Sequence, residues 1–306
     1  MKENKFLIIG YGNMGALHSE ILFSLVDDCK FDIVDKKKIK LIGKHLNQIK
    51  FENITDVNSY NGIIIATHSD SHLDYIKKLK DFNKLIFIEK PLVTNQKELN
   101  YFKEESNKNI FCGLIETHNE LFSIAKDNMK SEPFHIQVER ISPPLNSERI
   151  KDDVDFDLTI HDISVALEFF INNKDIVSSD STNIKKNKNG LYEMNTLNVH
   201  TKNCLLNFSS SRLGQKKIRK WKIFTIDEQV EIDLIKKEIT VTRKNKKISL
   251  KKNQLVQDFN EKMIIDTKIN PGHKQMVEYL KCLENNSKEY KYNNLLNAHE
   301  ILLDSK

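Results

Sequence analysis

The sequence predicts an α/β fold made of a doubly wound parallel sheet followed by an α+β domain with a large, open, mainly antiparallel sheet. Up to about residue 117, short apolar runs alternate with single helical patterns, which is typical of right-handed βαβ crossovers. Beyond that point, strand-like segments follow one another without intervening helices, which indicates antiparallel pairing. We therefore expect two domains, residues 1–117 and residues 118–306.

In the first domain, apolar runs predict five strands separated by helices. Apolar residues at helical spacing after the first run, beginning at Met14, predict the first helix. Further helices are expected around "HLDYIKKLKDF" and after Thr94. The predicted strands are "KFLIIG", "FDIVD", "GIIIATHS", "LIFIEKP" and "NIFCGLI".

In the second domain, alternating segments dominate. Helices are expected at "ELFSIAKDNMK", "DLTIHDISVALEFF", "GHKQMVEYLKCL" and "NLLNAHEILL". Strands are expected at "FHIQVER", "NTLNVHT", "CLLNFSSS", "WKIFTI", "VEIDLI" and "EITVTR", and "SPPLNSE" reads as a loop. These helices can cover one side of the sheet, so we expect the other face to carry enough apolar area to drive self-association.

Composition narrows the classes of function. The chain has 306 residues, 39% hydrophobic and 30% charged, with a net charge of +5. It has no dense basic run interleaved with aromatic residues, so we expect no nucleic-acid partner. The four cysteines form no C-x-x-C pair, so we expect neither a disulfide framework nor a metal site. No apolar stretch reaches 18 residues, so we expect a cytoplasmic protein without a membrane anchor.

The stretch "GYGNMG", Gly10 to Gly15, follows the first predicted strand and opens the first predicted helix. In this context G-x-G-x-x-G is the fingerprint of a Rossmann dinucleotide-binding turn. Gly10 allows the tight turn, Gly12 lets the backbone approach a pyrophosphate, and Gly15 allows close packing of helix on sheet. Asn13 and Met14 complete the predicted loop, and the helix N-terminus offers N–H groups to phosphates.

Asp35 ends the second predicted strand, about 20 residues beyond the glycines, where an acid bonds a ribose hydroxyl. A carboxylate there would repel the 2′-phosphate of NADP. The expected cofactor is therefore NAD, although Lys36, Lys37 and Lys38 follow at once and soften the preference. The alternative reading of Asp35 is a solvated strand end.

The chain resembles the Gfo/Idh/MocA oxidoreductase family over essentially its whole length. The matching stretches are "GYGNMG", "IIIATHSDSHLDYI", "IEKPL", "GLIETHNE" and "DLTIHDISVAL", in the order and spacing of that family. By this resemblance Lys90 of the E-K-P motif is a catalytic lysine beside the nicotinamide and the substrate hydroxyl. Pro91 would then fix the direction of Lys90, and Glu89 would support it and line the cofactor.

The resemblance also makes His161 a catalytic acid or base. Asp157 lies four residues before it, on the same face of the predicted helix, and Asp162 is adjacent. Without the resemblance, a structural histidine beside an acid would be the more common reading. Three further residues are implied as cofactor neighbours, with helix capping as the alternative: Thr67, Ser69 and His72.

The branch that the chain resembles most dehydrogenates UDP-N-acetylglucosamine, or its uronic acid, at the sugar 3-hydroxyl. Glu116 and Asn119 of "GLIETHNE" match that branch, whereas Thr117, His118 and Glu120 depart from it. Arg140 and Arg149 flank the proline loop and are candidate contacts for a diphosphate, or else surface arginines. Together with Lys90, Asp157 and His161, these four residues make up the tentative substrate set.

Two other functions remain open. A dehydrogenase of the same fold could act on a free polyol, inositol or aldose, which would not need arginines. A non-catalytic NAD sensor or scaffold would need neither Lys90 nor His161, so their presence argues against it. The resemblance also implies a homodimer or homotetramer that pairs through the C-terminal sheet.

Overall fold

The computed structural model describes residues 4–104, 109–143, 150–243, 249–251, 254–256, 261–264, 270–285 and 291–306. These divide into two compact units. The first contains residues 1–118 and 271–300, and the second contains residues 119–270 and 301–306. The first boundary falls within one residue of the predicted one, but residues 271–300 return to the first unit instead of remaining in the second.

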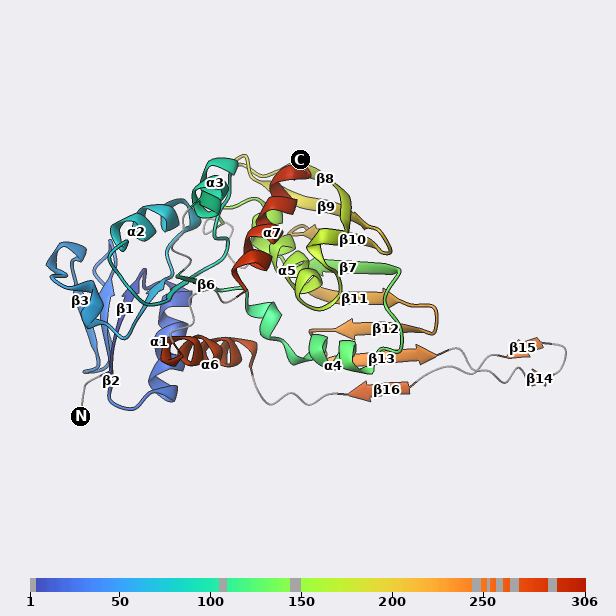
Figure 1. Cartoon of the computed structure of the whole chain (residues 1–306), viewed down its shortest axis with the longest axis horizontal. Coiled ribbons are helices and arrows are strands. Elements are labelled where there is room, and N and C mark those ends of the chain that lie inside the picture. Colours follow the sequence, from blue (N-terminus) through green and yellow to red (C-terminus); the bar gives the residue numbers. More distant parts are fainter. Residues whose placement is uncertain are drawn as a thin grey trace. The chain divides into compact units, whose positions relative to one another are not determined.

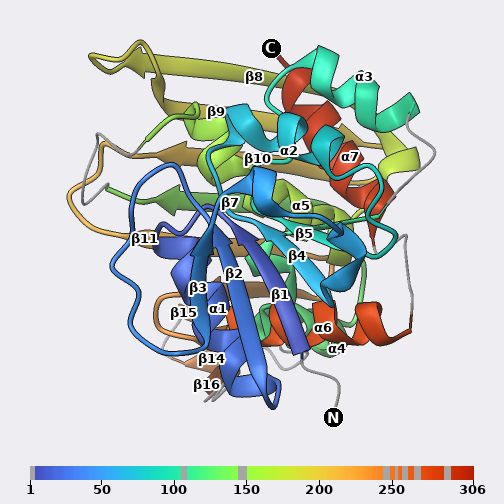
Figure 2. The same cartoon turned by 90° about the vertical axis from the view of Figure 1, so that its left-hand side faces the viewer.

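The first unit is built on a six-stranded sheet whose strands are all parallel (Figures 1 and 2). The strand order is β3-β2-β1-β4-β5-β6, which is the doubly wound order of a Rossmann fold. The strands are β1 (Asn4–Ile9), β2 (Cys29–Val34), β3 (Leu46–Ile49), β4 (Gly62–Ile65), β5 (Ile86–Ile88) and β6 (Ile110–Cys112). Their continuous apolar runs are buried, as a sheet covered on both faces requires.

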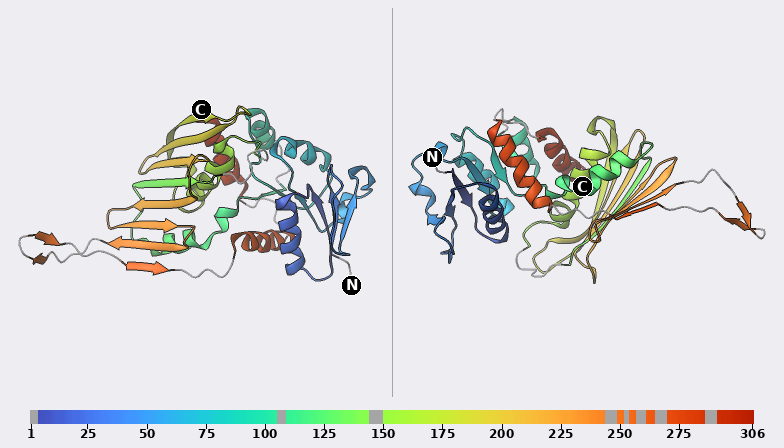
Figure 3. Two further views of the ribbon diagram at one scale, coloured as in Figure 1. Left: turned by 180° about the vertical axis from the view of Figure 1, so that it is seen from behind. Right: turned by 90° about the horizontal axis from the view of Figure 1, so that it is seen from below.

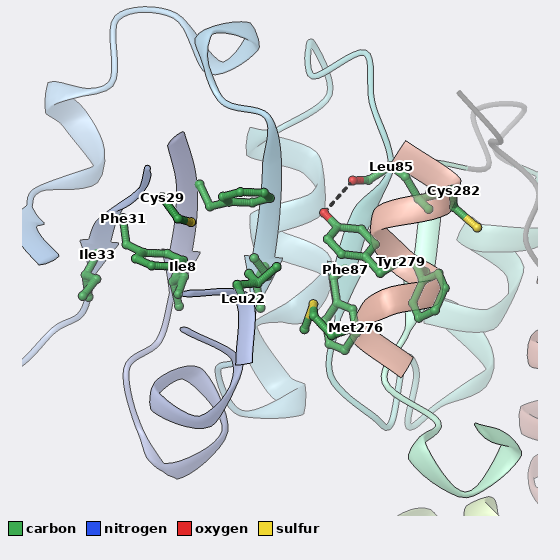
Figure 4. Packing of buried hydrophobic residues seen from close by; sticks show 13 residues of the cluster. Ile8, Leu22, Cys29, Phe31, Ile33, Leu85, Phe87, Met276, Tyr279 and Cys282 are labelled. Carbon is green, nitrogen blue, oxygen red and sulfur yellow. Dashed lines mark hydrogen bonds between the residues drawn. The ribbon is translucent and has the colours of Figure 1, made fainter. Parts of the chain in front are cut away.

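Four helices belong wholly to this unit: α1 (Asn13–Leu25), α2 (His72–Lys78), α3 (Gln96–Glu104) and α6 (Pro271–Glu284). Helix α6 returns here because its buried side chains complete the core. Met276 and Tyr279 pack in one cluster with Leu22 of α1 and Phe87 of β5 (Figure 4). The Tyr279 hydroxyl donates to the carbonyl of Leu85 at 3.0 Å. No local pattern in the sequence reveals this pairing of distant segments.

The second unit contains an eight-stranded sheet in the order β16-β13-β12-β11-β7-β10-β9-β8, antiparallel except for the β7–β10 pair. Its strands are β7 (His135–Ile141), β8 (Ile176–Lys186), β9 (Tyr192–Thr201), β10 (Leu205–Ser211), β11 (Ile218–Phe224), β12 (Glu228–Asp233), β13 (Glu238–Arg243) and β16 (Glu261–Ile264). A separate two-stranded sheet joins β14 (Ser249–Lys251) and β15 (Gln254–Val256). The predicted fold class, a parallel sheet followed by a mainly antiparallel one, is confirmed.

Helices α4 (Glu120–Asn128) and α5 (Ile160–Phe169) lie on one face of this sheet (Figure 3), and α7 (Tyr292–Asp304) ends in the second unit. A π-helical turn, Asp155–Thr159, leads directly into α5. Short 3₁₀ turns lie at Phe51–Asn53, Val57–Ser59, Ser69–Ser71, Ile115–His118 and Asn173–Asp175.

The opposite face of the second sheet is polar at its centre, so apolar side chains make up a smaller part of it than expected. The exposed positions of β7 are Gln137 and Glu139. Side chains bond one another across neighbouring strands: His135 to Asn207 at 2.7 Å, Asn207 to Asn198 at 2.8 Å, and Asn198 to Asp180 at 2.9 Å. Apolar residues on this face, such as Ile141, Leu205 and Phe224, lie at strand ends.

Candidate active site

The glycine loop joins β1 to α1 and has the geometry that its sequence predicts. Gly10 has φ +88°, and a Cβ added to it would lie 2.7 Å from the carbonyl oxygen of Ala66 and 2.8 Å from Cγ2 of Thr67. A Cβ added to Gly15 would lie 2.1 Å from the carbonyl oxygen of Gly10. Both positions therefore need glycine, Gly10 for the turn and Gly15 for packing of α1 on the loop.

Gly12 serves a different purpose. A Cβ added there would meet no heavy atom within 4 Å, so the space above this residue is open. Gly12 is the N-cap of α1 and offers no side chain to the first N–H groups of the helix. Asn13 and Met14 form the first turn and are exposed and half-buried respectively. An open cradle beside unused helix N–H groups fits a pyrophosphate.

Asp35 lies over the same loop, immediately after β2. Its Oδ2 accepts the backbone N–H of Tyr11 at 2.8 Å, and its Oδ1 accepts that of Lys37 at 2.8 Å. A carboxylate can accept about four hydrogen bonds, so acceptor capacity remains for ribose hydroxyls. The two bonds fix the orientation of this carboxylate before any ligand binds.

The segment after β4 contributes Thr67, Ser69 and His72, and the structure separates their roles. Thr67 lies against Gly10, and its hydroxyl accepts from Ser71 at 2.8 Å. Ser69 is buried in the 3₁₀ turn that precedes α2. His72 is 1% exposed and lies 3.0 Å through Nδ1 from the carbonyl oxygen of Pro91. Thr67 thus borders the glycine loop, whereas His72 supports the E-K-P segment.

Glu89, Lys90 and Pro91 follow β5 at the carboxyl edge of the parallel sheet, where such folds bind ligands. Glu89 is buried, with Oε1 2.6 Å from Nε2 of His18 and Oε2 accepting the backbone N–H of Lys90 at 3.2 Å. Lys90 itself is half-buried, and the Lys90–Pro91 peptide is cis.

A buried histidine of α7 also supports this segment. Nε2 of His299 accepts the backbone N–H of Leu92 at 3.0 Å, while Nδ1 donates to the carbonyl of Leu295 at 2.8 Å. Burial lowers the pKa of His299 to about 4, and the bond to Leu295 opposes that shift. Three buried histidines, His18, His72 and His299, therefore bond to residues 89–92, and only His72 was a predicted site residue.

The stretch "GLIETHNE" lies after β6. Gly113 adjoins Glu89, since an added Cβ would lie 3.0 Å from its Oε2. Glu116 is buried in the 3₁₀ turn. His118 stacks on Phe111 with ring centroids 5.9 Å apart. Burial, followed by Lys291 and Lys274, lowers the pKa of His118 to about 3. His118 therefore behaves as an aromatic core residue.

In the second unit, Asn119 caps α4, because its Oδ1 accepts the N–H of Leu121 at 3.2 Å. Asp157 lies in the π-helical turn and His161 in the first turn of α5, where it is half-buried. The spacing of these two residues therefore crosses a widened turn and not the regular helix that was predicted.

Arg212, at the end of β10, holds Asp157 and was not predicted from the sequence. Its Nη2 donates to Oδ2 of Asp157 at 2.8 Å and to the carbonyl of Asp152 at 2.9 Å. Its Nη1 donates to the carbonyl of Tyr192 at 3.2 Å. The guanidinium is almost fully buried, whereas Asp157 is 32% exposed. Arg212 thus fixes the carboxylate that precedes His161.

Of the two predicted diphosphate arginines, the structure describes Arg140 alone. Arg140 is 1% exposed, and Nε and Nη2 donate to the Asp162 carboxylate at 2.6 and 2.8 Å. This bidentate pair joins α5 to β7, and its burial holds the guanidinium away from solvent. Arg149 lies outside the described residues.

With the loop geometry established, comparison with known proteins identifies the first domain. Residues 4–110 match the Gfo/Idh/MocA family, described as an oxidoreductase family with an NAD-binding Rossmann fold. The chain carries a Gfo/Idh/MocA NAD-binding domain. The resemblance found in the sequence is confirmed, and so is NAD as the cofactor.

The proteins to which the whole chain is similar include dehydrogenases named for polyol and sugar substrates. Myo-inositol 2-dehydrogenase of Thermotoga maritima is 23% identical over 242 residues, which cover 74% of this chain and 71% of the relative. UDP-N-acetylglucosamine 3-dehydrogenase of Acidithiobacillus ferrooxidans superimposes with a TM-score of 0.79 at 15% identity, over 99% of this chain and 96% of that one. Levoglucosan dehydrogenase in complex with NADH superimposes with a TM-score of 0.78 at 13% identity, over 97% of this chain and 94% of that one. At these identities the structural matches establish the fold alone.

Two negative observations concern the described residues. They contain no group of three or more His, Cys, Asp or Glu side chains placed to hold a metal ion. Among the same residues, no helix has both the length and the apolar character that crossing a membrane requires.

Proposed function

We propose that this NAD-binding oxidoreductase dehydrogenates a secondary alcohol of a sugar, a nucleotide sugar or a cyclic polyol. The observation that carries this proposal is that buried side chains hold the segment containing Lys90 in place. Side chains of α1, α2 and α7 hold the E-K-P segment at the sheet edge where the glycine loop and Asp35 also lie. A lysine fixed beside a dinucleotide loop suits proton transfer during hydride transfer.

In this proposal NAD supplies the hydride acceptor, and the side chains move the proton. Lys90 bonds the reacting hydroxyl and takes or relays its proton. His161 serves as a second acid or base. Asp157 provides a negative charge near it in the sequence, and Arg212 holds the Asp157 carboxylate in place. Glu116 and Asn119 are proposed as substrate neighbours because of their sequence match, although Asn119 also caps a helix.

For the substrate, we propose the 3-hydroxyl of a UDP-N-acetyl sugar, supported by "GLIETHNE" and by the likeness to UDP-N-acetylglucosamine 3-dehydrogenase. A free polyol such as inositol is the second candidate. It is favoured by the inward pairing of Arg140 with Asp162, which leaves a diphosphate without that contact, and by the inositol-dehydrogenase relative.

The deciding experiment measures NADH formation at 340 nm with UDP-sugars, free sugars and inositols, in parallel with NADH binding. Turnover of a UDP-N-acetyl sugar but not of the free sugar supports the first candidate, and turnover of inositol alone supports the second. Tight NADH binding without turnover of any alcohol would replace the enzyme by the NAD sensor.

Self-association through the second sheet remains part of the proposal, on different grounds from those first expected. The polar side chains of His135, Asn207, Asn198 and Asp180 bond in a row across this face. A partner would therefore be recognised through hydrogen bonds more than through apolar area. Light scattering that gives a monomer mass at micromolar concentration would count against a homodimer or homotetramer.

A further inference from the structure

Helix α1, which begins at the glycine loop, sends one polar side chain beneath the E-K-P segment. This is His18, three residues after Gly15, and its Nε2 lies 2.6 Å from Oε1 of Glu89. The side chains of His18 and Glu89 are 2% and 9% exposed. The ring of Phe87 meets the imidazole edge-on, with centroids 4.7 Å apart. The pair is therefore enclosed within the first unit.

Three separate motifs meet at the Glu89 carboxylate. His18 follows "GYGNMG", Glu89 begins E-K-P, and Gly113 begins "GLIETHNE". A Cβ on Gly113 would lie 3.0 to 3.1 Å from all three atoms of the carboxyl group, so glycine provides its space. The carboxylate is thus confined from one side by Gly113 and held from the other by His18.

The hydrogen bonds specify one arrangement of protons. Nδ1 of His18 is buried and has no hydrogen-bond partner among the described residues. An imidazolium would leave an N–H unsatisfied at that position, which is unfavourable in a buried site. The neutral tautomer with its proton on Nε2 donates to Glu89, while Oε2 of Glu89 accepts the backbone N–H of Lys90.

We propose that His18 is a positioning residue, which sets the direction of Lys90 through Glu89 and ties it to the helix that receives the pyrophosphate. This rests on the proposed role of Lys90. Because one end of α1 faces the cofactor and its second turn holds Glu89, a shift of the helix is passed to the backbone N–H of Lys90. His72 and His299 reach the segment differently, because they bond to the carbonyl of Pro91 and the N–H of Leu92, beyond Lys90. His72 also lies 3.2 Å through Nε2 from the carbonyl oxygen of Thr67.

The test compares His18→Leu with His18→Gln. Leucine fills the site without a donor, whereas the glutamine amide can place an N–H near the position of Nε2. We expect His18→Leu to lower kcat by about 10²-fold, the scale of a small misplacement of a reacting group. NADH affinity should change little, because the glycine loop and Asp35 are intact. His18→Gln should recover most of the rate.

Two further variants separate positioning from stability. Leu22→Ala removes a buried side chain of the same helix that belongs to the apolar core. It should lower the melting temperature yet keep kcat at temperatures where it is folded. Gly113→Ala keeps both members of the pair but presses on the carboxylate, and it serves if His18→Leu does not fold. It should also reduce kcat with little change in NADH affinity.

A readout without substrate keeps this inference apart from the proposed function. The backbone amide resonance of Lys90 in an NMR spectrum should shift in His18→Leu and return towards its original position in His18→Gln. Unchanged kcat and an unchanged Lys90 resonance in His18→Leu would overturn the inference, as would equal losses in Leu and Gln variants. If the unaltered protein oxidises no alcohol, the proposed function fails and the Lys90 resonance still decides the link.

Discussion

The backbone N–H of Leu92 donates to Nε2 of His299, a residue 207 positions further along the chain, at 3.0 Å. This bond requires that Nε2 carries no proton. The ring proton is therefore on Nδ1, which donates it in a hydrogen bond to the carbonyl of Leu295. Protonation of His299 would therefore break the bond that supports the end of the E-K-P segment.

We expect the free energy of unfolding to fall as the pH drops below about 6.5. The pKa of His299 is lowered by burial from 6.5 to about 4, so the unfolded chain binds the extra proton first. The contribution of His299 is then fully present above pH 6.5 and declines towards pH 4, by on the order of 1.4 kcal/mol per pH unit. His118, whose pKa is also lowered by burial, adds a decline of its own over this range. Urea unfolding between pH 4.5 and 7.5 measures this. His299→Gln keeps an acceptor without titrating, so an equally steep pH dependence in that variant would contradict the assignment.

Gly12→Val should abolish NADH binding while the protein stays folded, because the added side chain enters open space above the loop. Gly15→Ala is the matched control, since its Cβ would collide with the carbonyl oxygen of Gly10 and destabilise the fold. Calorimetric titration and thermal unfolding measure the two effects. A Gly12→Val protein that binds NADH normally would show that the pyrophosphate lies elsewhere.

Asp35→Asn should narrow the preference for NADH over NADPH by about tenfold, equivalent to about 1.4 kcal/mol. The amide removes the charge that repels a 2′-phosphate, while its oxygen can still accept the N–H of Tyr11. Fluorescence titration with both cofactors measures the ratio. Lys37→Ala keeps the backbone bond to Asp35 but removes a cation expected to soften the preference, so it should shift the ratio in the opposite direction, towards NADH. Tighter NADPH than NADH binding in the unaltered protein would contradict the argument.

Lys90→Met and His161→Asn should each slow turnover by roughly 10²–10⁴-fold, the usual range for general acid–base groups. Methionine keeps much of the lysine's apolar volume, so lost packing is a small part of the effect. Because the two groups are proposed to serve one proton transfer, the double variant should lose less than the product of the single losses. Stopped-flow hydride transfer measures the chemical step, and wild-type rates in both single variants would refute the catalytic assignment.

Arg140→Met should destabilise the protein by about 3–5 kcal/mol, because it leaves the Asp162 carboxylate buried without its partner. The double variant Arg140→Met, Asp162→Leu should regain much of that loss. Denaturant unfolding measures both. If Arg140 instead contacted a diphosphate, Arg140→Met would raise KM for a UDP-sugar far above its effect on a free sugar, at a temperature where it is folded.

The sequence predicted the strands with an apolar or alternating pattern and missed the edge strands β3 and β8, which have neither. Apolar runs such as Ile63–Ile65 predict a central strand, and alternation of apolar and polar residues in β11 and β12 predicts a half-buried strand. The strands β3 and β8 lie at the ends of their sheets. The four residues of β3, LNQI, neither alternate nor form an apolar run, and β8 is mostly polar. The return of α6 to the first unit depends on contacts such as Tyr279 with Leu85, which only the fold creates.

In the site, local signals predicted what is local. The glycine loop and Asp35 have fixed spacing, and both are in place. His18 and His299 escaped prediction because their partners are 71 and 207 residues away. A histidine on the sheet-facing side of α1, in line with Gly15 and Leu22, was an available signal for His18. Arg212 gave no comparable signal, since it follows a strand in an ordinary polar stretch.

The π-helical turn at Asp155–Thr159 has a consequence for protein engineering. Each residue of an α-helix advances by about 100° around the axis. Adding or removing one residue in a turn therefore rotates the residues before it by that angle relative to the residues after it. If residues 155–169 were replaced by a regular α-helix from a relative, an aspartate at position 157 would be rotated about the helix axis relative to a histidine at position 161. That aspartate would then point away from Arg212. Chimaeric proteins designed to change substrate preference should therefore exchange residues 152–162 and Arg212 together.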